Sequence, residues 1–423
     1  VGARSAANLS ASARIILDKA NVRAVSPQDG VVDRQALRNL TGGLRAVQDV
    51  IGESRTNLRG GGNFDLLVPQ LRDGVDDLIT QLGSVEHRVD VTIRGTQVAD
   101  RMLGYDAPRR FFIAMQNNAE SRATGGYIAN YGIVTMQNGG VVSREFKRTS
   151  EFDNSPKPRT LNAPLDFRRR YSRFDVDREW TNVNLSPDYP TVAGIIADQY
   201  KQFSDEEVDG VFTLDPIGLA SLLKLTGPVS VASWPVPLTD RNVAAIVLHD
   251  EYRAFDNNKA ARVDFLGEVG EAVFDKLLAG GLDDVLAAAP VIEEMIEGRR
   301  LQVWSGNRSA AQFFAETGSD GAVADTTGDS FIVTTQNAAA NKADYFLRRT
   351  IKYEAAVARQ GNGLAVDAKA TIRLTNGAPA SGLPRYVIGP NGDGFKAGQN
   401  RLFVSFYSPF DVAQATLDGQ KLH

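Results

Sequence analysis

The stretch FFIAMQNNAESRATGG, residues 111–126, decides the fold of this chain. Its first five residues, Phe111–Met115, are apolar, and the run ends abruptly at Gln116. A short apolar run bounded by a polar, glycine-containing segment is typical of a buried strand. In open α/β sheets, ligands bind where such strands end. We therefore expect residues 116–126 to form a turn that belongs to a functional site.

Two glycines close this expected turn. Gly125 and Gly126 allow a positive φ or a close approach of the backbone to a ligand. The alternation of residues 127–136 predicts the returning strand of a hairpin. A purely structural interpretation is equally open, in which the asparagines cap the turn and Arg122 pairs with Glu120.

The composition indicates a globular protein of more than one domain. With 423 residues and 43% hydrophobic content, the chain can bury a large core and divide into two or three domains. The formal net charge of −4 argues against a nucleic-acid partner, because neutralising phosphates requires a basic face. No apolar stretch approaches the roughly 18 residues that span a bilayer. Because the first residue is not Met, we expect that an N-terminal signal, anchor or tag was removed.

The chain has no cysteine and few histidines. Thiolate nucleophiles, disulfides and sulfur-ligated metals are therefore excluded. His87, His249 and His423 lie far apart in the sequence, which disfavours a His-based zinc site and a Ser-His-Asp triad. His249 is the one candidate base, although a lone histidine beside two acidic residues is more often a surface residue.

The first hundred residues show helical periodicity. Apolar residues recur at three- and four-residue steps over 37–51 and again over 71–93, which predicts two amphipathic helices. The glycine-rich turn at 60–63 predicts an antiparallel hairpin of these helices, joined by a shorter helix over 6–19. We expect residues 1–104 to form a helical stalk or bundle.

Strand and helix patterns alternate from residue 105 to about 327, which predicts an α/β core domain with a mixed sheet. The expected strands are 111–115, 128–136, 141–146, 210–214 and 229–231, and the expected helices are 191–203, 216–225, 240–252, 262–278 and 310–317. The charge-rich segment 144–184 lacks helical or strand spacing and resembles a long functional loop or a solvated lid.

Short alternating runs with Asn-Gly, Gly-Pro and Pro punctuation follow from residue 328 to the end. They fall at 330–335, 345–356, 363–374 and 401–406, and helical periodicity is absent. We expect residues 328–423 to form a small all-β, sandwich-like domain.

Five blocks of sequence carry a resemblance to a known bacterial family. They are FIAMQNNAESRATGG (112–126), NLSPDYP (184–190), VDGVFTLDP (208–216), LTGPV (225–229) and NKADY (341–345). In this order they resemble the family catalogued as domain of unknown function 4012. Members are typically envelope proteins with an N-terminal transmembrane helix and an outward-facing body. The resemblance therefore implies an extracytoplasmic protein anchored in the cytoplasmic membrane of a bacterium through the removed N-terminal segment.

The order of these blocks is also distantly similar to the LytR-CpsA-Psr ligases. These enzymes transfer glycopolymers from a polyprenyl-pyrophosphate carrier to the cell wall, and arginines with an acidic residue hold the pyrophosphate and a divalent metal. By position, the matching arginines are Arg122, Arg148, Arg253 and Arg262. The ligases carry an aspartate in the first turn where this chain has Asn117 and Asn118, so a metal there would depend on Glu120.

Elementary chemistry supports this assignment. A pyrophosphate transfer needs cations that neutralise the charge developing on the leaving group, and Arg presents planar bidentate donors better than Lys does. Mg²⁺ would complete such a site, since it favours carboxylates together with substrate phosphates. The resemblance thus implies catalytic roles for Arg122, Arg148 and Glu120. It implies substrate contacts for Asn117, Asn118, Arg253 and Arg262, and position adds Asp188. Each arginine alone also suits a structural ion pair.

Two further functions remain open on the sequence. Asp188, Asp209 and Asp215 near strand ends would suit general acid-base hydrolysis of a wall polysaccharide. Asp209 before a strand and Asp215 before Pro216 also fit a turn and a helix N-cap. Alternatively, the protein is a non-catalytic surface module that binds or scaffolds. The leading hypothesis predicts that the named arginines converge in one cleft around a wall or polyprenyl-linked glycan.

Overall fold

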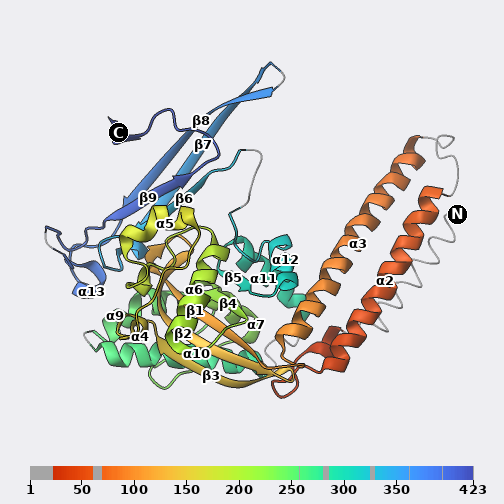
Figure 1. Ribbon diagram of the computed structural model, residues 1–423, viewed down its shortest axis with the longest axis horizontal. Helices are drawn as coiled ribbons and strands as arrows, with labels where there is room; N and C mark the ends of the chain where they lie inside the picture. Colours follow the sequence, from red (N-terminus) through yellow and green to blue (C-terminus); the bar gives the residue numbers. More distant parts are fainter. Residues whose placement is uncertain are drawn as a thin grey trace.

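The computed structural model consists of a helical hairpin, an α/β body and a set of C-terminal strands (Figure 1). It describes residues 22–60, 69–256, 258–279, 285–323, 329–361, 363–392 and 394–422. The predicted mixed α/β core and N-terminal helical hairpin are confirmed, and the C-terminal part forms small antiparallel sheets. It is not all-β, because it also contains the short helical turns Ala343–Phe346 and Arg385–Ile388. The predicted boundary at 327/328, the helix over 6–19 and the turn residues 61–63 lie outside the described residues.

Helices α2 (Arg34–Gly60) and α3 (Pro69–Met102) run antiparallel and project from the body in Figure 1. A short 3₁₀ turn, η1 (Val22–Val25), precedes them. Their apolar seam packs as the periodicity predicts, with Val47 and Ile51 buried against Leu82. At the base of the hairpin, the Arg34 side chain bonds the carboxylates of Asp100 and Asp106, which fixes the start of α2 to the end of α3. No helix among the described residues is both long and apolar enough to cross a bilayer.

The body is built on a five-stranded mixed sheet of order β3-β2-β1-β4-β5. Its strands are β1 (Arg109–Arg122), β2 (Gly125–Gln137), β3 (Gly140–Arg148), β4 (Gly210–Leu214) and β5 (Leu301–Ser305). The central strand β1 is antiparallel to β2 and parallel to β4. Its sequence explains this position, because Phe112 and Ala114 are fully buried.

The predicted end of the first strand at Met115 is wrong. β1 continues through the polar residues to Arg122, and only Ala123 and Thr124 connect it to β2. Two register irregularities, at Met115/Gln116 and between Asn117 and Ser121, let the polar half bend while it stays paired. Apolar character marks where β1 enters the core and does not mark where its hydrogen-bond ladder ends.

Helices cover both faces of the sheet. They are α6 (Tyr189–Ser204), α7 (Pro216–Thr226), α10 (Lys259–Leu278), α11 (Val285–Glu297) and α12 (Arg308–Glu316). The helix predicted over 240–252 is present as α8 (Val243–Ala245), the π-helical turn η5 (Ile246–Asp250) and α9 (Glu251–Ala254). The predicted strand 229–231 is only a bridge between Val229 and Leu238, while α11 and β5 were not predicted.

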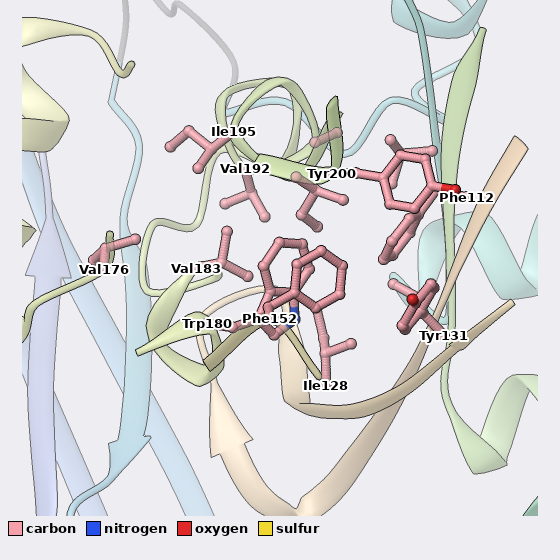
Figure 2. Packing of buried hydrophobic residues seen from close by; sticks show 14 of the residues in the cluster. Phe112, Ile128, Tyr131, Phe152, Val176, Trp180, Val183, Val192, Ile195 and Tyr200 are labelled. Atoms are coloured by element: carbon pink, nitrogen blue, oxygen red, sulfur yellow. The ribbon is translucent and has the colours of Figure 1, made fainter. Parts of the chain in front are cut away.

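The interpretation of residues 144–184 as a loop or lid is wrong. The segment holds α4 (Ser150–Asp153), α5 (Leu165–Tyr171), η3 (Ser172–Phe174) and η4 (Trp180–Asn182). Phe152 and Trp180 are fully buried and stacked with ring centroids 4.0 Å apart, next to Phe112 (Figure 2). Charged residues between the aromatics conceal a segment that supplies part of the core.

The C-terminal part pairs as small antiparallel sheets. Its elements are β6 (Ile332–Asn337), η6 (Ala343–Phe346), β7 (Leu347–Gln360), β8 (Gly363–Asn376), α13 (Arg385–Ile388), β9 (Leu402–Tyr407), β10 (Thr416–Leu417) and β11 (Gln420–Lys421). β6 pairs with β9, and β7 pairs with β8 in a hairpin that projects from the body (Figure 1). Nearly all described side chains of the hairpin are exposed, whereas residues 334–337 of β6 are buried. The C-terminal part therefore docks on the body through β6 and η6.

Candidate functional site

The polar half of β1 is packed against its own hairpin. Gly125 has φ +140°, and a Cβ there would overlap the Gln116 side chain. A Cβ on Gly126 would overlap the Asn117 backbone. Both positions therefore require glycine, as expected. The close approach that requires it, however, is between β2 and β1, whereas the sequence suggested an approach to a ligand.

A buried ion cluster lies beside this half of β1. The Glu120 carboxylate accepts a hydrogen bond from Lys342 Nζ at 2.6 Å, and Arg122 Nη2 lies 3.6 Å from the same carboxylate. The predicted Arg122–Glu120 pair is therefore confirmed. Arg122 also donates to the carbonyl oxygens of Thr181 and Ser121. Burial lowers the pKa of Arg122, and the charge of Glu120 opposes that shift.

Lys342 connects this cluster to the C-terminal part. Burial alone would lower the pKa of its ammonium group, but the Glu120 carboxylate raises it above the ordinary value. The ammonium also lies 5.0 Å from the ring centroid of Tyr127 and 5.5 Å from that of Tyr386. A buried cation held by a carboxylate and two aromatic faces fixes the C-terminal part onto β1.

A second set of buried charges lies beside α9. Arg262 contacts the Tyr252 and Tyr386 rings, with its Cζ 4.9 and 4.5 Å from their centroids. Its Nε is 4.0 Å from the buried Glu251 carboxylate, whose oxygens accept no hydrogen bond from the part of the chain that the structure describes. Burial raises the pKa of Glu251 to about 8. The positive charges of Arg262 and Lys342 offset only part of this rise in pKa. Asn117 Nδ2 donates to the Tyr252 hydroxyl at 3.0 Å and so bridges this set to β1.

The expected convergence of arginines is only partial. Arg122 and Arg262 both lie beside the Lys342 cluster. Arg148 ends β3 opposite Asn130, and the exposed Arg253 donates to the Gly382 carbonyl at 3.2 Å. Neither is among the described residues that line the two cavities below. Whether any of these residues acts on a substrate stays a prediction.

An apolar cavity of about 140 Å³ lies between the sheet and the helices that follow β4. Its polar rim comprises Gln116, Asn117 and Asp215, with Asn130 from β2. Its walls come from β1, β3, α7, η5 and α10, and they include Ile113, Met115, Phe146, Leu219, Leu222, Val247, Leu266, Val269, Val273, Phe274 and Leu277. Such a cavity suits a hydrocarbon group whose polar end lies at the rim.

A larger cavity of about 430 Å³ is polar and lies where β1 meets the C-terminal part. Its walls come from the β1–β2 turn, the residues before β5, strand β6 and the start of β7. The lining residues are Asn118, Ser121, Arg122, Ala123, Thr124, Gly125, Pro187, Gly298, Arg299, Arg300, Ile332, Val333, Thr334, Thr335, Asp344, Leu347 and Arg349. Two expected residues, Asn118 and Arg122, are among them. Arg299, Arg300 and Arg349 were missed, because neither β5 nor the docking of β7 was evident in the sequence.

Asp215 links the two cavities. Its Oδ2 accepts hydrogen bonds from Asn118 Nδ2 and Arg300 Nη1, both at 2.9 Å, and its Oδ1 accepts one from Gly218 N at 2.7 Å. Asp215 lines the apolar cavity, while Asn118 and Arg300 line the polar one. The trio therefore stands where the apolar and polar cavities approach each other. The predicted N-cap role of Asp215 before Pro216 is confirmed.

The other two aspartates considered for hydrolysis have structural partners. Asp188 caps α6 through Thr191 N, and Asp209 pairs with Arg109 at 2.9 Å. No three His, Cys, Asp or Glu side chains of the described chain come together in a metal-binding group. The expected Mg²⁺ stays a prediction. Binding through Glu120 would require that carboxylate to give up its bond with Lys342.

Comparison with known proteins identifies part of the chain. Residues 106–252 match the model of the family described as a protein of unknown function (DUF4012). No curated protein matches the sequence.

Among solved structures, the chain is similar to a protein of Streptococcus agalactiae, with 14% identity and a TM-score of 0.32 over 51% of this chain and 74% of that one. It is similar to Bacillus subtilis TagV with 11% identity and a TM-score of 0.28, over 53% of this chain and 87% of TagV. It is also similar to the B. subtilis transcriptional regulator yvhJ, with 12% identity and a TM-score of 0.26, over 53% and 85% of the two chains.

Proposed function

We propose that the protein binds a lipid-linked glycopolymer of the bacterial cell envelope, on the outer side of the cytoplasmic membrane. One observation carries the proposal: an apolar cavity and an arginine-lined polar cavity approach each other at Asp215, Asn118 and Arg300. A lipid-linked glycan has the matching chemistry, because its hydrocarbon chain joins its sugar through charged phosphates.

The dimensions favour binding of the proximal part of the chain. An engineered apolar cavity of about 150 Å³ holds a benzene-sized molecule. The apolar cavity here, at about 140 Å³, therefore accepts the first isoprene units of a carrier, and the rest of the chain leaves through the open mouth. The phosphates then lie past Asp215, on the side of Asn118 and Arg300 that lines the polar cavity.

Phosphoglycosyl transfer is the finer form of this proposal. In this step an acceptor hydroxyl attacks the sugar-side phosphorus of the pyrophosphate, the bond to the carrier-side phosphate breaks, and polyprenyl phosphate leaves. Positive groups must stabilise the charge on that leaving phosphate, and arginines at the polar cavity would supply them. Glu120 and Arg122, to which the resemblance assigns chemistry, are bonded to each other and to Lys342. Their participation would require this cluster to open, so binding without transfer is the simpler activity of the described conformation.

Two glycines of α10 provide the test. A Cβ on Gly270 would stand 3.4 Å from Met115 Cε in the apolar cavity, whereas a Cβ on Gly267 would meet nothing within 4 Å. We expect wild-type protein to bind farnesyl phosphate, a short prenyl phosphate. Gly270→Leu should weaken this binding at least about tenfold by filling the cavity. Gly267→Leu, the matched control on the same helix, should bind like wild type.

Isothermal titration of the three proteins measures these affinities. Absence of farnesyl phosphate binding to wild type at millimolar concentration would remove the proposal. Equal affinity of wild type and Gly270→Leu would remove the apolar cavity as the binding site. Incubation with a polyprenyl-linked glycan and a wall acceptor, followed by detection of released carrier phosphate, then separates transfer from binding alone.

A further inference from the structure

We propose that the polar cavity is a binding site for a phosphate-bearing polyanion, completed by Arg349 of the C-terminal hairpin together with Arg300 and Arg299 of the body. The inference deepens the proposed function. Only the statement that the anion belongs to a lipid-linked glycan rests on that function; the anion site itself does not. The residues of the site come from three separate segments. They are the β1–β2 turn, the Arg299-Arg300 pair before β5, and the first residues of β7.

The charge of the lining is strongly positive. Four arginines face the cavity and Asp344 is the one carboxylate among the described lining residues, in a chain of net charge −4. Asp344 is already engaged, because its Oδ2 accepts hydrogen bonds from Ser121 N at 2.7 Å and from Asn337 Nδ2 at 3.1 Å. Arg122 pairs with Glu120 and Arg300 with Asp215, both outside the lining, whereas Arg299 and Arg349 form no salt bridge with another described residue. These two further cations favour a multiply charged anion.

The three arginines outside the buried cluster keep donors available. Arg300 bonds Asp215 through Nη1, and Arg349 bonds the Val333 carbonyl through Nη1 at 3.3 Å. Arg299 bonds the carbonyl oxygens of Pro187 and Gly321 through Nη2. The Nε atoms and the second Nη atoms of these side chains donate to no acceptor in the part of the chain that the structure describes. These contacts orient each guanidinium and leave one side of it for a ligand, as bidentate phosphate recognition requires.

Burial makes the absence of an anionic partner costly for Arg299. Burial lowers the pKa of this guanidinium, and the charges of Asp188 and Asp320 only partly oppose the shift. A bound phosphate would supply the missing counter-charge. Arg299 also has φ +53°, which turns the chain sharply just before β5 and places two consecutive arginines at the same cavity.

The register of β7 explains how the C-terminal hairpin contributes. Successive side chains of a strand point to opposite faces, so Arg349 shares its face with Leu347 and Ile351, while Arg348 lies on the other face. Leu347 and Arg349 line the cavity and Arg348 does not. The buried Lys342–Glu120 pair and the Ser121–Asp344 bond hold the start of β7 beside β1. On this face of β7, Arg349 therefore lies between the apolar residues Leu347 and Ile351 and places a positive charge at the cavity.

Two sources would present the same anion chemistry. One is the pyrophosphate of a lipid-linked glycan, whose hydrocarbon end would enter the apolar cavity. The other is a phosphodiester of a wall polymer, which has no hydrocarbon end. Both have phosphate oxygens that accept paired N–H donors, so inorganic pyrophosphate is a suitable first probe for the site itself.

The matched pair Arg349→Gln and Arg348→Gln tests the site. Both changes remove one positive charge from exposed positions of the same strand, but only Arg349 lines the cavity. We expect wild type to bind pyrophosphate in a calorimetric titration, more weakly as salt rises, and Arg349→Gln to lose about tenfold in affinity. Arg348→Gln should stay within about twofold of wild type. Arg300→Lys, which keeps the charge but removes the planar fork, should also weaken binding.

Several outcomes would overturn the inference. One is that wild type does not bind pyrophosphate at millimolar concentration and low salt. Another is that Arg349→Gln and Arg348→Gln lose equal affinity, which would indicate nonspecific attraction. The variants are compared only after their circular dichroism and unfolding midpoints match wild type. If Arg300→Lys unfolds, the Arg349 and Arg348 pair still decides the question.

Further titrations separate this site from the proposed function. Gly270→Leu should bind inorganic pyrophosphate like wild type but bind farnesyl pyrophosphate more weakly than wild type does. If pyrophosphate binds and farnesyl pyrophosphate gains nothing over it, the anion site stands and the lipid-linked ligand fails. A glycerol phosphate oligomer that competes with pyrophosphate would then assign the site to a wall polymer.

Discussion

The apolar and polar cavities, which are connected by the hydrogen bonds of Asp215 with Asn118 and Arg300, are built in opposite ways. The walls of the apolar cavity come from regular elements, with side chains of α7 and α10 facing the sheet. The walls of the polar cavity come from turns and element ends that lie far apart in the sequence, such as Thr124 and Leu347. Packing shapes the first cavity, whereas buried charges hold the second one together. The two cavities thus depend on different forces and should respond to different perturbations.

The largest effect should come from the buried charge that holds the polar side. Lys342→Ala leaves Glu120 without its closest cation and removes a positive charge near Glu251. Loss of one partner from a buried ion pair typically costs about 3–5 kcal/mol. Urea unfolding should show a loss of this size. Lys352→Ala, which removes an exposed lysine paired with Glu354, should lose less than about 1 kcal/mol. Similar losses in both variants would contradict a charge-held polar side.

The next effect is a pH dependence of stability that originates at Glu251. Its folded-state pKa of about 8 lies above the ordinary carboxyl value, so the folded protein binds the proton more tightly than the unfolded chain. The contribution is complete below the unfolded pKa and is lost as pH rises through about 8, by up to about 1.4 kcal/mol per pH unit. The facing groups are Arg262, Lys342 and Tyr252. Burial raises the pKa of Tyr252, and the Glu120 carboxylate raises that of Lys342 in spite of its burial, so neither of these two groups changes its charge below pH 8.

Glu251→Gln should therefore flatten the fall in unfolding free energy between about pH 5 and 8, measured by urea titration at each pH. The variant keeps the shape of the side chain and removes its proton equilibrium. An unchanged slope in Glu251→Gln would show that another group causes the dependence.

A smaller loss should follow from crowding the β1–β2 hairpin. Gly126→Ala places a Cβ against the Asn117 backbone, which cannot move without disturbing the bulge. Overpacking of this kind typically costs about 1–3 kcal/mol. Gly194→Ala on α6, where a Cβ meets nothing within 4 Å, is the control and should be neutral or slightly stabilising. Thermal unfolding should rank Gly126→Ala below wild type and Gly194→Ala at or above it.

The smallest effect concerns two arginines that the sequence resemblance selects. Arg148 and Arg253 lie outside the described lining of both cavities, so Arg148→Ala and Arg253→Ala should change pyrophosphate affinity by less than about twofold. Titration under the conditions used for Arg349→Gln measures this. A loss as large as that of Arg349→Gln in either variant would move the anion site to the positions that the resemblance implies.

The sequence predicts the fold best where burial of one apolar face determines the local structure. The period of apolar residues located α6, α7 and α10 to within a few residues, because each helix buries one face. It also located the starts of α2 and α3, but both helices continue well beyond the periodic residues 37–51 and 71–93. It failed over 144–184, where charged residues separate Phe152 and Trp180 although both are in the core. It also ended β1 too early, because backbone pairing continues through polar residues that the C-terminal part covers.

The candidate site was predictable in part for the same reason. Asn118 and Arg122 are in the polar segment that the sequence singles out, and both line the polar cavity. Arg299, Arg300 and Arg349 could not be found, since their position depends on long-range docking of β5 and β7. The paired arginines after Gly298 are a weak signal, because such pairs are common on protein surfaces.

The central claim is that one amphiphilic ligand occupies both cavities across Asp215. A crystal structure of the protein with farnesyl pyrophosphate tests it most directly. We predict density for the hydrocarbon chain beside Met115 and Gly270, with the phosphates within hydrogen-bond distance of Arg300 and Arg349. Density for the ligand on another surface, or with both its ends outside these two cavities, would contradict the account.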